Sequence, residues 1–194
     1  MGPNIRFTRE QIIDAAFEIA KTEGMDKISM RKIAELTGSS VAPIYVNFKN
    51  IDELNEALIE RIVSISQQLL EEENTGNPFY DMGSASLRFA LEYSIIFKDM
   101  VTKGSKYLQD YDDTMLPILI EEMKKEPELE EFTEDELKKI FFKMRIFQLG
   151  LSIMAANGSL PKEYTKQKMM EILCGIADDM IAAAKLRRTL IDEK

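Results

Sequence analysis

The sequence predicts an all-α protein, and three observations support this prediction. Apolar residues recur at spacings of three and four along most of the chain, which is the pattern of a helix with one buried face. No stretch shows the period of two that a half-buried strand requires. Residue types that start helices, and glycines that end them, divide the chain at short intervals.

The first helix is expected to begin after Thr8. Thr8 and Gln11 have the spacing of a capping box, in which each side chain bonds the other residue's backbone N–H. Phe7 and Ile12 are placed to pack over this start as a hydrophobic staple. Gly24 is expected to end the helix as a left-handed cap.

Two short helices follow, separated by a tight turn. Ser29 is expected to cap the first of them, which ends at Gly38. Ser39 or Ser40 is expected to cap the second, which ends near Phe48. A helix, a tight turn and a short helix within a three-helix unit form a helix-turn-helix, the geometry that places a recognition helix in the major groove of DNA.

A long helix is predicted from its cap, Asn50, to the acidic run at residues 71–73. Its apolar stripe is unbroken and comprises Ile51, Leu54, Leu58, Ile62, Ile65 and Leu69. We place a boundary near Asn50, which gives an N-terminal domain over residues 1–50 and a helical body over residues 51–194. Because no flexible linker separates them, this helix is expected to connect them rigidly.

The body is expected to contain four further helices. They are predicted over residues 78–98, 114–125, 134–157 and 161–188. The segment over residues 103–113 is expected to form one short helix or only a loop.

The composition argues against several kinds of chemistry. The chain has no histidine, which excludes Ser-His-Asp and Cys-His catalysis and most zinc sites. Its one cysteine, Cys174, cannot form an intrachain disulfide. There is no apolar run of about 18 residues and no secretory signal. We therefore expect a cytoplasmic protein without membrane association, catalytic residues, metal or cofactor.

The net charge of −9 opposes binding to nucleic acid, because contacts to phosphate need Lys and Arg. The acidity is unevenly distributed. Residues 1–61 hold eight basic and ten acidic side chains, whereas residues 62–194 hold 17 and 24. A dimer can still bind DNA if its basic groups converge on one face, with binding that is sensitive to salt.

The residues of the helix-turn-helix carry a family resemblance. Residues 24–54 read GMDKISMRKIAELTGSSVAPIYVNFKNIDEL. The Ile-Ala pair at 33–34, the turn glycine at 38, the apolar–Tyr–x–x–Phe run at 44–48 and the Asn cap at 50 resemble the DNA-binding segment of the TetR family. The resemblance implies a transcriptional regulator that binds a double-stranded DNA operator and a small-molecule effector, with residues 51–194 forming the ligand-binding and dimerisation domain.

By this resemblance, ten residues lie on or beside the recognition helix and contact DNA: Arg31, Lys32, Ser39, Ser40, Val41, Ala42, Pro43, Tyr45, Asn47 and Lys49. Ser40 and Asn47 suit hydrogen bonds to bases or phosphates, and the apolar residues at 41–43 suit thymine methyls. Tyr45 is expected to donate to phosphate, or else to be a core ring with a wet hydroxyl. Ile44 and Phe48 are expected to be core.

Arg31 and Lys32 oppose the dipole in the first turn of their helix. A phosphate bound at this helix start would make the two cations favourable, so we expect at least one of them to contact phosphate. The alternative is that both side chains are only solvated at the surface. Three positions depart from the family pattern: Val41 stands where a basic residue is frequent, Asn47 where His is usual, and Ile51 where Lys contacts phosphate.

The resemblance also implies that the last two helices form a four-helix bundle with a partner chain. The residues assigned to this dimer interface are Phe147, Leu151, Met154, Leu173, Ile176, Ala177, Met180 and Ile181. A purely intrachain core is the alternative. Aromatic and Met residues of the middle helices are expected to line an effector pocket or to be plain core: Phe89, Tyr93, Phe97, Tyr107, Tyr111, Met115, Phe141 and Met144.

We therefore expect a homodimeric repressor that a small, apolar or aromatic effector releases from a palindromic operator. The alternative is a helical small-molecule-binding protein that has lost DNA binding. A histidine-free enzyme would need convergent carboxylates, whereas the acidic residues fall mostly at caps and on solvated faces.

Overall fold

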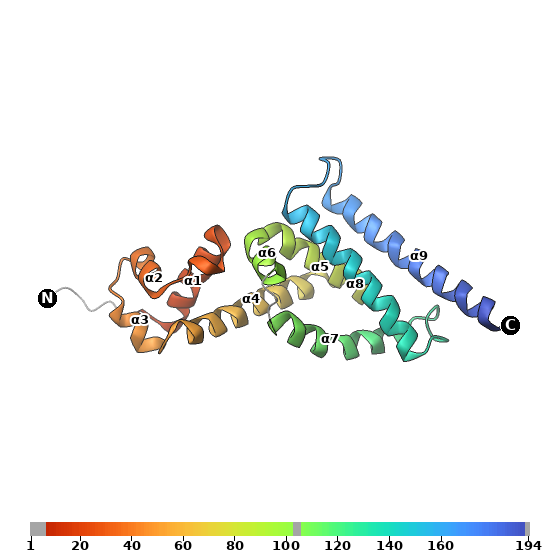
Figure 1. Ribbon diagram of the computed structural model, residues 1–194, viewed down its shortest axis with the longest axis horizontal. Helices are drawn as coiled ribbons and strands as arrows, with labels where there is room; N and C mark the ends of the chain where they lie inside the picture. The colour runs from red at the N-terminus through yellow and green to blue at the C-terminus, as the bar shows by residue number, and fades with distance from the viewer. Residues whose placement is uncertain (1–6, 103–105, 193–194) are drawn as a thin grey trace.

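The computed structural model describes residues 7–102 and 106–192, with the side chains of 78–79, 106–115 and 191–192 left aside. All regular structure in these residues is helical, as the sequence predicts (Figure 1). An N-terminal unit contains α1 (Arg9–Glu23), the 3-10 turn η1 (Met25–Lys27), α2 (Met30–Thr37) and α3 (Ala42–Asn47). The long α4 (Ile51–Glu73) leads from this unit into the body.

The body consists of α5 (Pro78–Glu92), α6 (Ser94–Thr102), α7 (Lys106–Lys125), α8 (Glu134–Ala156) and α9 (Lys166–Asp192). Figure 1 shows an elongated molecule with the N-terminal unit at one end, and with α8 and α9 side by side along the body. Across the described residues, no helix combines the length and the apolar character needed to cross a membrane.

Several predicted helix starts are confirmed by their hydrogen bonds. The Thr8 hydroxyl accepts from the Gln11 backbone N–H at 3.2 Å, and the side-chain Oε1 of Gln11 accepts from the Thr8 N–H at 3.0 Å. Ser29 and Asn50 cap α2 and α4 by accepting a backbone N–H three residues ahead. These caps satisfy donors that the first helical turn leaves unpaired, so they fix where each helix begins.

The predicted start of the third helix is wrong. α3 begins after Val41 rather than at Ser39 or Ser40, and no side chain caps it. The Ser39 hydroxyl instead donates to the Ser40 carbonyl at 2.9 Å. Pro43 lies in the first turn of α3, where its missing N–H costs no hydrogen bond.

Three boundaries in the body also differ from the predictions. The helix expected over 78–98 breaks between α5 and α6, where the Tyr93 ring packs against Phe17 and Phe89 with ring centroids 5.7 and 5.4 Å apart. α7 already begins at Lys106, so it covers most of the segment expected to be a loop or short helix. α9 begins after Thr165, whose hydroxyl accepts from the Lys168 N–H at 3.3 Å, and not at Pro161.

One hydrophobic core joins the N-terminal unit to the body through α4. On α4, Leu54, Leu58 and Ile62 are fully buried, and Leu69 is nearly so. The same cluster contains residues of α1 to α3 and of α5 and α6. Apolar burial is the main stabilising contribution to folding, so this shared core restrains the N-terminal unit and the body together.

Gly24 lies where the N-terminal unit meets α6. Its backbone has φ 102° and ψ 159°, so the left-handed helical cap predicted there is wrong. The next residue, Met25, donates its N–H to the Asp99 carboxylate of α6 at 2.7 Å. A Cβ atom at Gly24 would lie 3.0 Å from that same carboxylate oxygen, so a side chain here conflicts with both the backbone and α6.

We expect Gly24→Ala to lower the free energy of unfolding by about 2 kcal/mol, because its backbone conformation is nearly restricted to glycine. Gly38→Ala is the matched control: Gly38 also has a positive φ, of 66°, but nothing lies within 4 Å of its Cβ position. This control should lose only about 1 kcal/mol in urea unfolding. Equal losses in the two variants would contradict the role of the α6 contact.

Candidate nucleic-acid interface and ligand cavity

The angle between α2 and α3 is set by a tight turn and by buried side chains beneath it. Gly38 adopts the left-handed conformation that ends α2, and the Ser39 N–H returns to the Ala34 carbonyl at 2.8 Å. Ile33 and Ile44 pack into the core beneath the turn, with 0% and 1% exposure. This arrangement presents α3 on the outside of the N-terminal unit, as a helix-turn-helix requires.

One face of α3 is exposed. Ala42, Tyr45 and Val46 follow helical spacing along it, and the exposed fractions of Tyr45 and Val46 are 55% and 86%. The opposite face holds Ile44 and Phe48, which are core as predicted. Val46 was not assigned to this face from the sequence. In a helix, a residue two positions after the buried Ile44 lies on the opposite side, so the helical spacing would have placed Val46 beside Tyr45 on the exposed face.

Eight of the ten residues assigned to DNA lie in α3 or directly beside it in the chain, whereas Arg31 and Lys32 lie in the first turn of α2. Six of the ten are exposed: Arg31, Ser40, Val41, Ala42, Tyr45 and Lys49. The other four are half-buried: Lys32, Ser39, Pro43 and Asn47. Tyr45 is therefore not the core ring of the alternative interpretation.

The side-chain amide of Asn47 already makes structural contacts. Its nitrogen donates to the Pro43 carbonyl at 2.9 Å and to the Phe7 carbonyl at 3.3 Å. These bonds hold the start of α1 against the end of α3. A hydrogen bond from this nitrogen to a base would compete with them, which makes Asn47 a weaker candidate for base contact than the sequence indicates.

Carboxylates accompany the basic residues of the candidate interface. Arg31 pairs with Glu35 at 3.1 Å, and Lys32 pairs with Glu23. Ion pairs at an exposed surface contribute little to stability and exchange readily. The two cations can therefore turn to phosphate, but the neighbouring carboxylates lower the positive potential that phosphate meets.

Arg9 ties α1 to the end of α3 and the start of α4. Its guanidinium lies 4.2 Å from the Phe48 ring centroid, donates to the Asn47 carbonyl at 3.1 Å and pairs with Glu53 at 3.3 Å. The second carboxylate oxygen of Glu53 accepts the Lys49 N–H at 2.9 Å. The Lys49 N–H, aided by Arg9, lowers the pKa of Glu53 below its ordinary value of 4.5.

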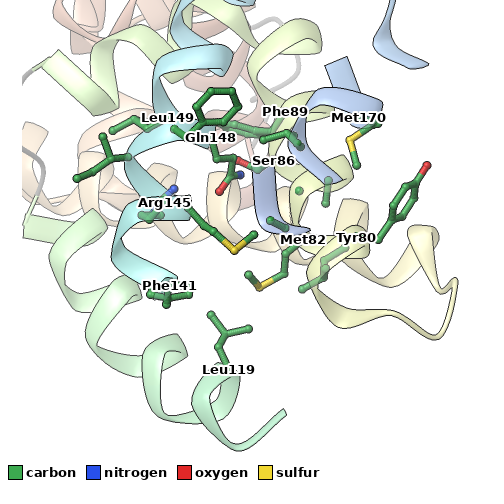
Figure 2. Close-up of a pocket in the computed structure, with 18 of the residues that line it drawn as sticks. Tyr80, Met82, Ser86, Phe89, Leu119, Phe141, Arg145, Gln148, Leu149 and Met170 are labelled. Carbon is green, nitrogen blue, oxygen red and sulfur yellow. The ribbon is translucent and has the colours of Figure 1, made fainter. Parts of the chain in front are cut away.

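A cavity of about 490 Å³ lies within the body (Figure 2). Its wall is mainly apolar, with α4 to α9 all contributing residues. Of the residues assigned to the effector pocket, Phe89, Phe97, Phe141 and Met144 line it. Tyr93 does not and packs on Phe17 instead, because it sits at the α5–α6 break. The side chains of the other three, Tyr107, Tyr111 and Met115, lie outside the described residues.

Polar groups that the sequence did not single out also line this cavity. Ser86 on α5 and Gln148 on α8 face the space between these helices, with Arg145 one turn before Gln148 (Figure 2). Arg145 carries an interaction of its own, so its charge is not wholly available to a ligand. A mainly apolar cavity with a few polar groups is the usual form of a small-molecule site.

The residues assigned to the dimer interface divide between inner and outer faces. Leu151 is 8% exposed, and Phe147 and Leu173, both half-buried, pack against its cluster within the chain. Ile181 packs against a second buried cluster, while Ile176 and Ala177 line the cavity and Met180 is half-buried. Only Met154 of this set is clearly exposed, at 45%.

A different apolar stripe of α8 is exposed. Phe142, Ile146, Gly150 and Met154 follow one another at intervals of four, and Phe142 and Ile146 are 63% and 56% exposed. α9 adds Leu186 and Leu190, which are also exposed. Among the described residues, no cluster of His, Cys, Asp or Glu could hold a metal ion.

Comparison with known proteins matches one segment of the chain to a family. Residues 12–58 match the family described as bacterial regulatory proteins, tetR family. A helix-turn-helix-type transcriptional regulator from Haemophilus influenzae is 34% identical over 73 residues, which cover 37% of this chain and 39% of the relative. The nicotine-responsive transcriptional repressor HdnoR from Paenarthrobacter nicotinovorans is 37% identical over 62 residues, or 32% and 30% of the two chains. The matched part thus spans less than half of either relative.

The fold extends the similarity over nearly the whole chain. The crystal structure of a TetR-like transcriptional regulator from Rhodococcus sp. RHA1 superposes with a TM-score of 0.68 and 18% identity. The superposition covers 90% of this chain and 96% of the other. At this identity the match establishes a shared architecture.

The lowered pKa of Glu53 predicts an acid-dependent contribution to stability. Because the folded state favours the carboxylate, the contribution is present above pH 4.5 and is lost as the pH falls through the folded-state pKa. Glu53→Gln should therefore lower the urea midpoint at pH 7, and its difference from the wild type should shrink as the pH falls below 4.5. Glu56→Gln, exposed on the same helix, is the control. A difference that stays constant with pH would contradict this role.

Proposed function

This chain belongs to the TetR family of bacterial regulatory proteins, and we propose that it is a transcriptional repressor that binds operator DNA as a homodimer. The observation that carries this proposal is the exposed face of α3, held outward on a capped helix-turn-helix at the end of α4. In this proposal residues 1–50 bind DNA, and residues 51–194 bind the effector and the partner.

Recognition would place α3 in the major groove, with Tyr45 and Lys49 toward the DNA backbone and Ser40 and Ala42 toward base edges. Arg31 and Lys32 reach phosphate by leaving Glu35 and Glu23. This exchange costs part of the Coulomb attraction, so we expect modest affinity that falls steeply as salt rises.

The proposed dimer uses the exposed stripe of α8 with the outer face of α9. Phe142, Ile146 and Met154 are apolar and uncovered, and Gly150 between them allows close approach of a partner helix. Two helices from each chain then form a four-helix bundle. The resulting two-fold axis requires a palindromic operator whose half-sites are about one helical turn apart, or a small multiple.

The effector would occupy the cavity in the body. An apolar or aromatic molecule suits its wall of Met and Phe side chains, with Ser86 or Gln148 fixing its orientation. The effector releases DNA only to the extent that it binds one conformer better than the other. α6 is placed to carry this difference, because Phe97 and Met100 line the cavity while Asp99 holds the start of η1.

Selection of bound sequences from random duplex DNA, followed by titration at two salt concentrations, tests the proposed DNA binding. We expect a palindrome to be enriched. Lys49→Ala should weaken its binding, and Glu35→Gln should strengthen it several-fold by freeing Arg31. Glu163→Gln, in the exposed α8–α9 connection, is the control for net charge. No enrichment by folded protein at low salt would overturn the proposal and favour a small-molecule-binding protein without DNA binding.

Ile146→Asp tests the proposed dimer face. A charge in an apolar four-helix interface should shift the protein from twice its chain mass to the 22.2 kDa monomer in light scattering at micromolar concentration. Leu91→Asp, on the exposed face of α5, should leave the mass unchanged. Circular dichroism verifies that both variants fold. A dimer that persists in Ile146→Asp would place the interface elsewhere.

A further inference from the structure

Val46 occupies its position at a cost to folding. Its side chain is 86% exposed, more than any other large hydrophobic residue whose exposure the structure gives. Exposing a Val forgoes the stabilisation that burial would give, and a β-branched residue is also a poor helix former. A residue that breaks two local rules without a compensating contact in the fold is typical of a binding surface.

The surroundings of Val46 restrict what it can bind on DNA. α3 contains no Arg or Lys, so the commonest contact to guanine is missing from this helix. The amide nitrogen of Asn47, the group that would read adenine, is bonded to two backbone carbonyls. Ala42 lies on the same exposed face one turn earlier and is also apolar. In the major groove, the apolar group that base edges offer is the C5-methyl of thymine.

We propose that Val46 is a specificity-determining residue that packs against the C5-methyl group of one thymine in each operator half-site. The inference rests on the proposed function, because it requires α3 in the major groove. It predicts that α3 favours A·T pairs and recognises them largely through the methyl group.

Removing single methyl groups from the DNA tests the contact. In the enriched operator, each thymine of a half-site is replaced in turn by deoxyuridine, which keeps the base pair and removes only the methyl. At one position, wild-type affinity should fall about fourfold, and about sixteenfold when both half-sites are changed. In Val46→Ala the same replacement should have no effect, because the side chain no longer reaches the methyl.

Two controls separate this contact from a general loss of binding. Leu36→Ala removes an exposed apolar side chain from α2 and should retain the deoxyuridine penalty. The second control uses the position where deoxyuridine lowers affinity. Replacing T·A by C·G there weakens binding. Putting 5-methylcytosine in place of that cytosine should raise the affinity of the wild type about fourfold but leave that of Val46→Ala unchanged. Val46→Ala should fold, because alanine favours the helix.

The inference is overturned if deoxyuridine at every thymine leaves wild-type affinity unchanged, or if the same penalty persists in Val46→Ala. Either result still requires a bound operator, so it leaves the proposed function standing. If selection enriches no duplex, the proposed function itself fails, and the contact at Val46 fails with it.

Discussion

The continuity of α4 is the constraint on which the rest of the structure depends. Its 23 residues span about 35 Å without interruption. At its start the Asn50 cap and the Arg9–Glu53 pair fix it to the N-terminal unit. At its end Arg88 of α5 pairs with Glu72 at 3.0 Å and Glu73 at 3.6 Å. Its buried stripe packs in one core along its length, so the N-terminal unit and the body lack a flexible joint.

Two helices, α4 and α6, connect the cavity physically to the N-terminal unit. Ile62, Val63 and Ser66 of α4 form part of the cavity wall, and the same helix begins at the Arg9 contacts beside α3. The second connection is α6, whose Asp99 accepts the Met25 N–H on the side away from the cavity. Close packing transmits small displacements, so in the proposed function a ligand that moves either helix would change the orientation of α3.

Features that depend on neighbouring residues were predictable from the sequence. Capping by Thr8, Ser29 and Asn50 involves partners three residues away, so its spacing is visible in the chain itself. The helix break at Tyr93 was not predictable, because the ring is held by Phe17 of α1, which is distant in sequence. The hydrogen bond from the Asn47 side-chain nitrogen to the Phe7 carbonyl joins residues that are equally remote in sequence.

The apolar faces of α8 show the same limit. Periodicity identifies the apolar residues of the helix but cannot state which stripe the other helices cover. Leu151 and Phe147 meet α9 and α5 within the chain, whereas Ile146 remains outside. The cavity was predictable as a cluster of aromatic and Met residues. Its polar members, Ser86 and Gln148, were not, because only the packing of α5 against α8 brings them together.

The separation of the two helix-turn-helix units in the proposed dimer is the most direct test of the proposed function. In a Cys174→Ser background, a nitroxide attached at Leu36→Cys, which is exposed on α2 and outside the residues assigned to DNA, reports the distance between the two helix-turn-helix units by electron spin resonance. With the selected operator bound, we expect a narrow distance distribution corresponding to one turn of DNA, about 34–36 Å, or a small multiple, offset by the position and reach of the labels. The absence of dipolar coupling would contradict the proposed dimer. A distance distribution that stays broad, or does not match the spacing of the major groove, when operator DNA is bound would contradict the proposed binding to DNA.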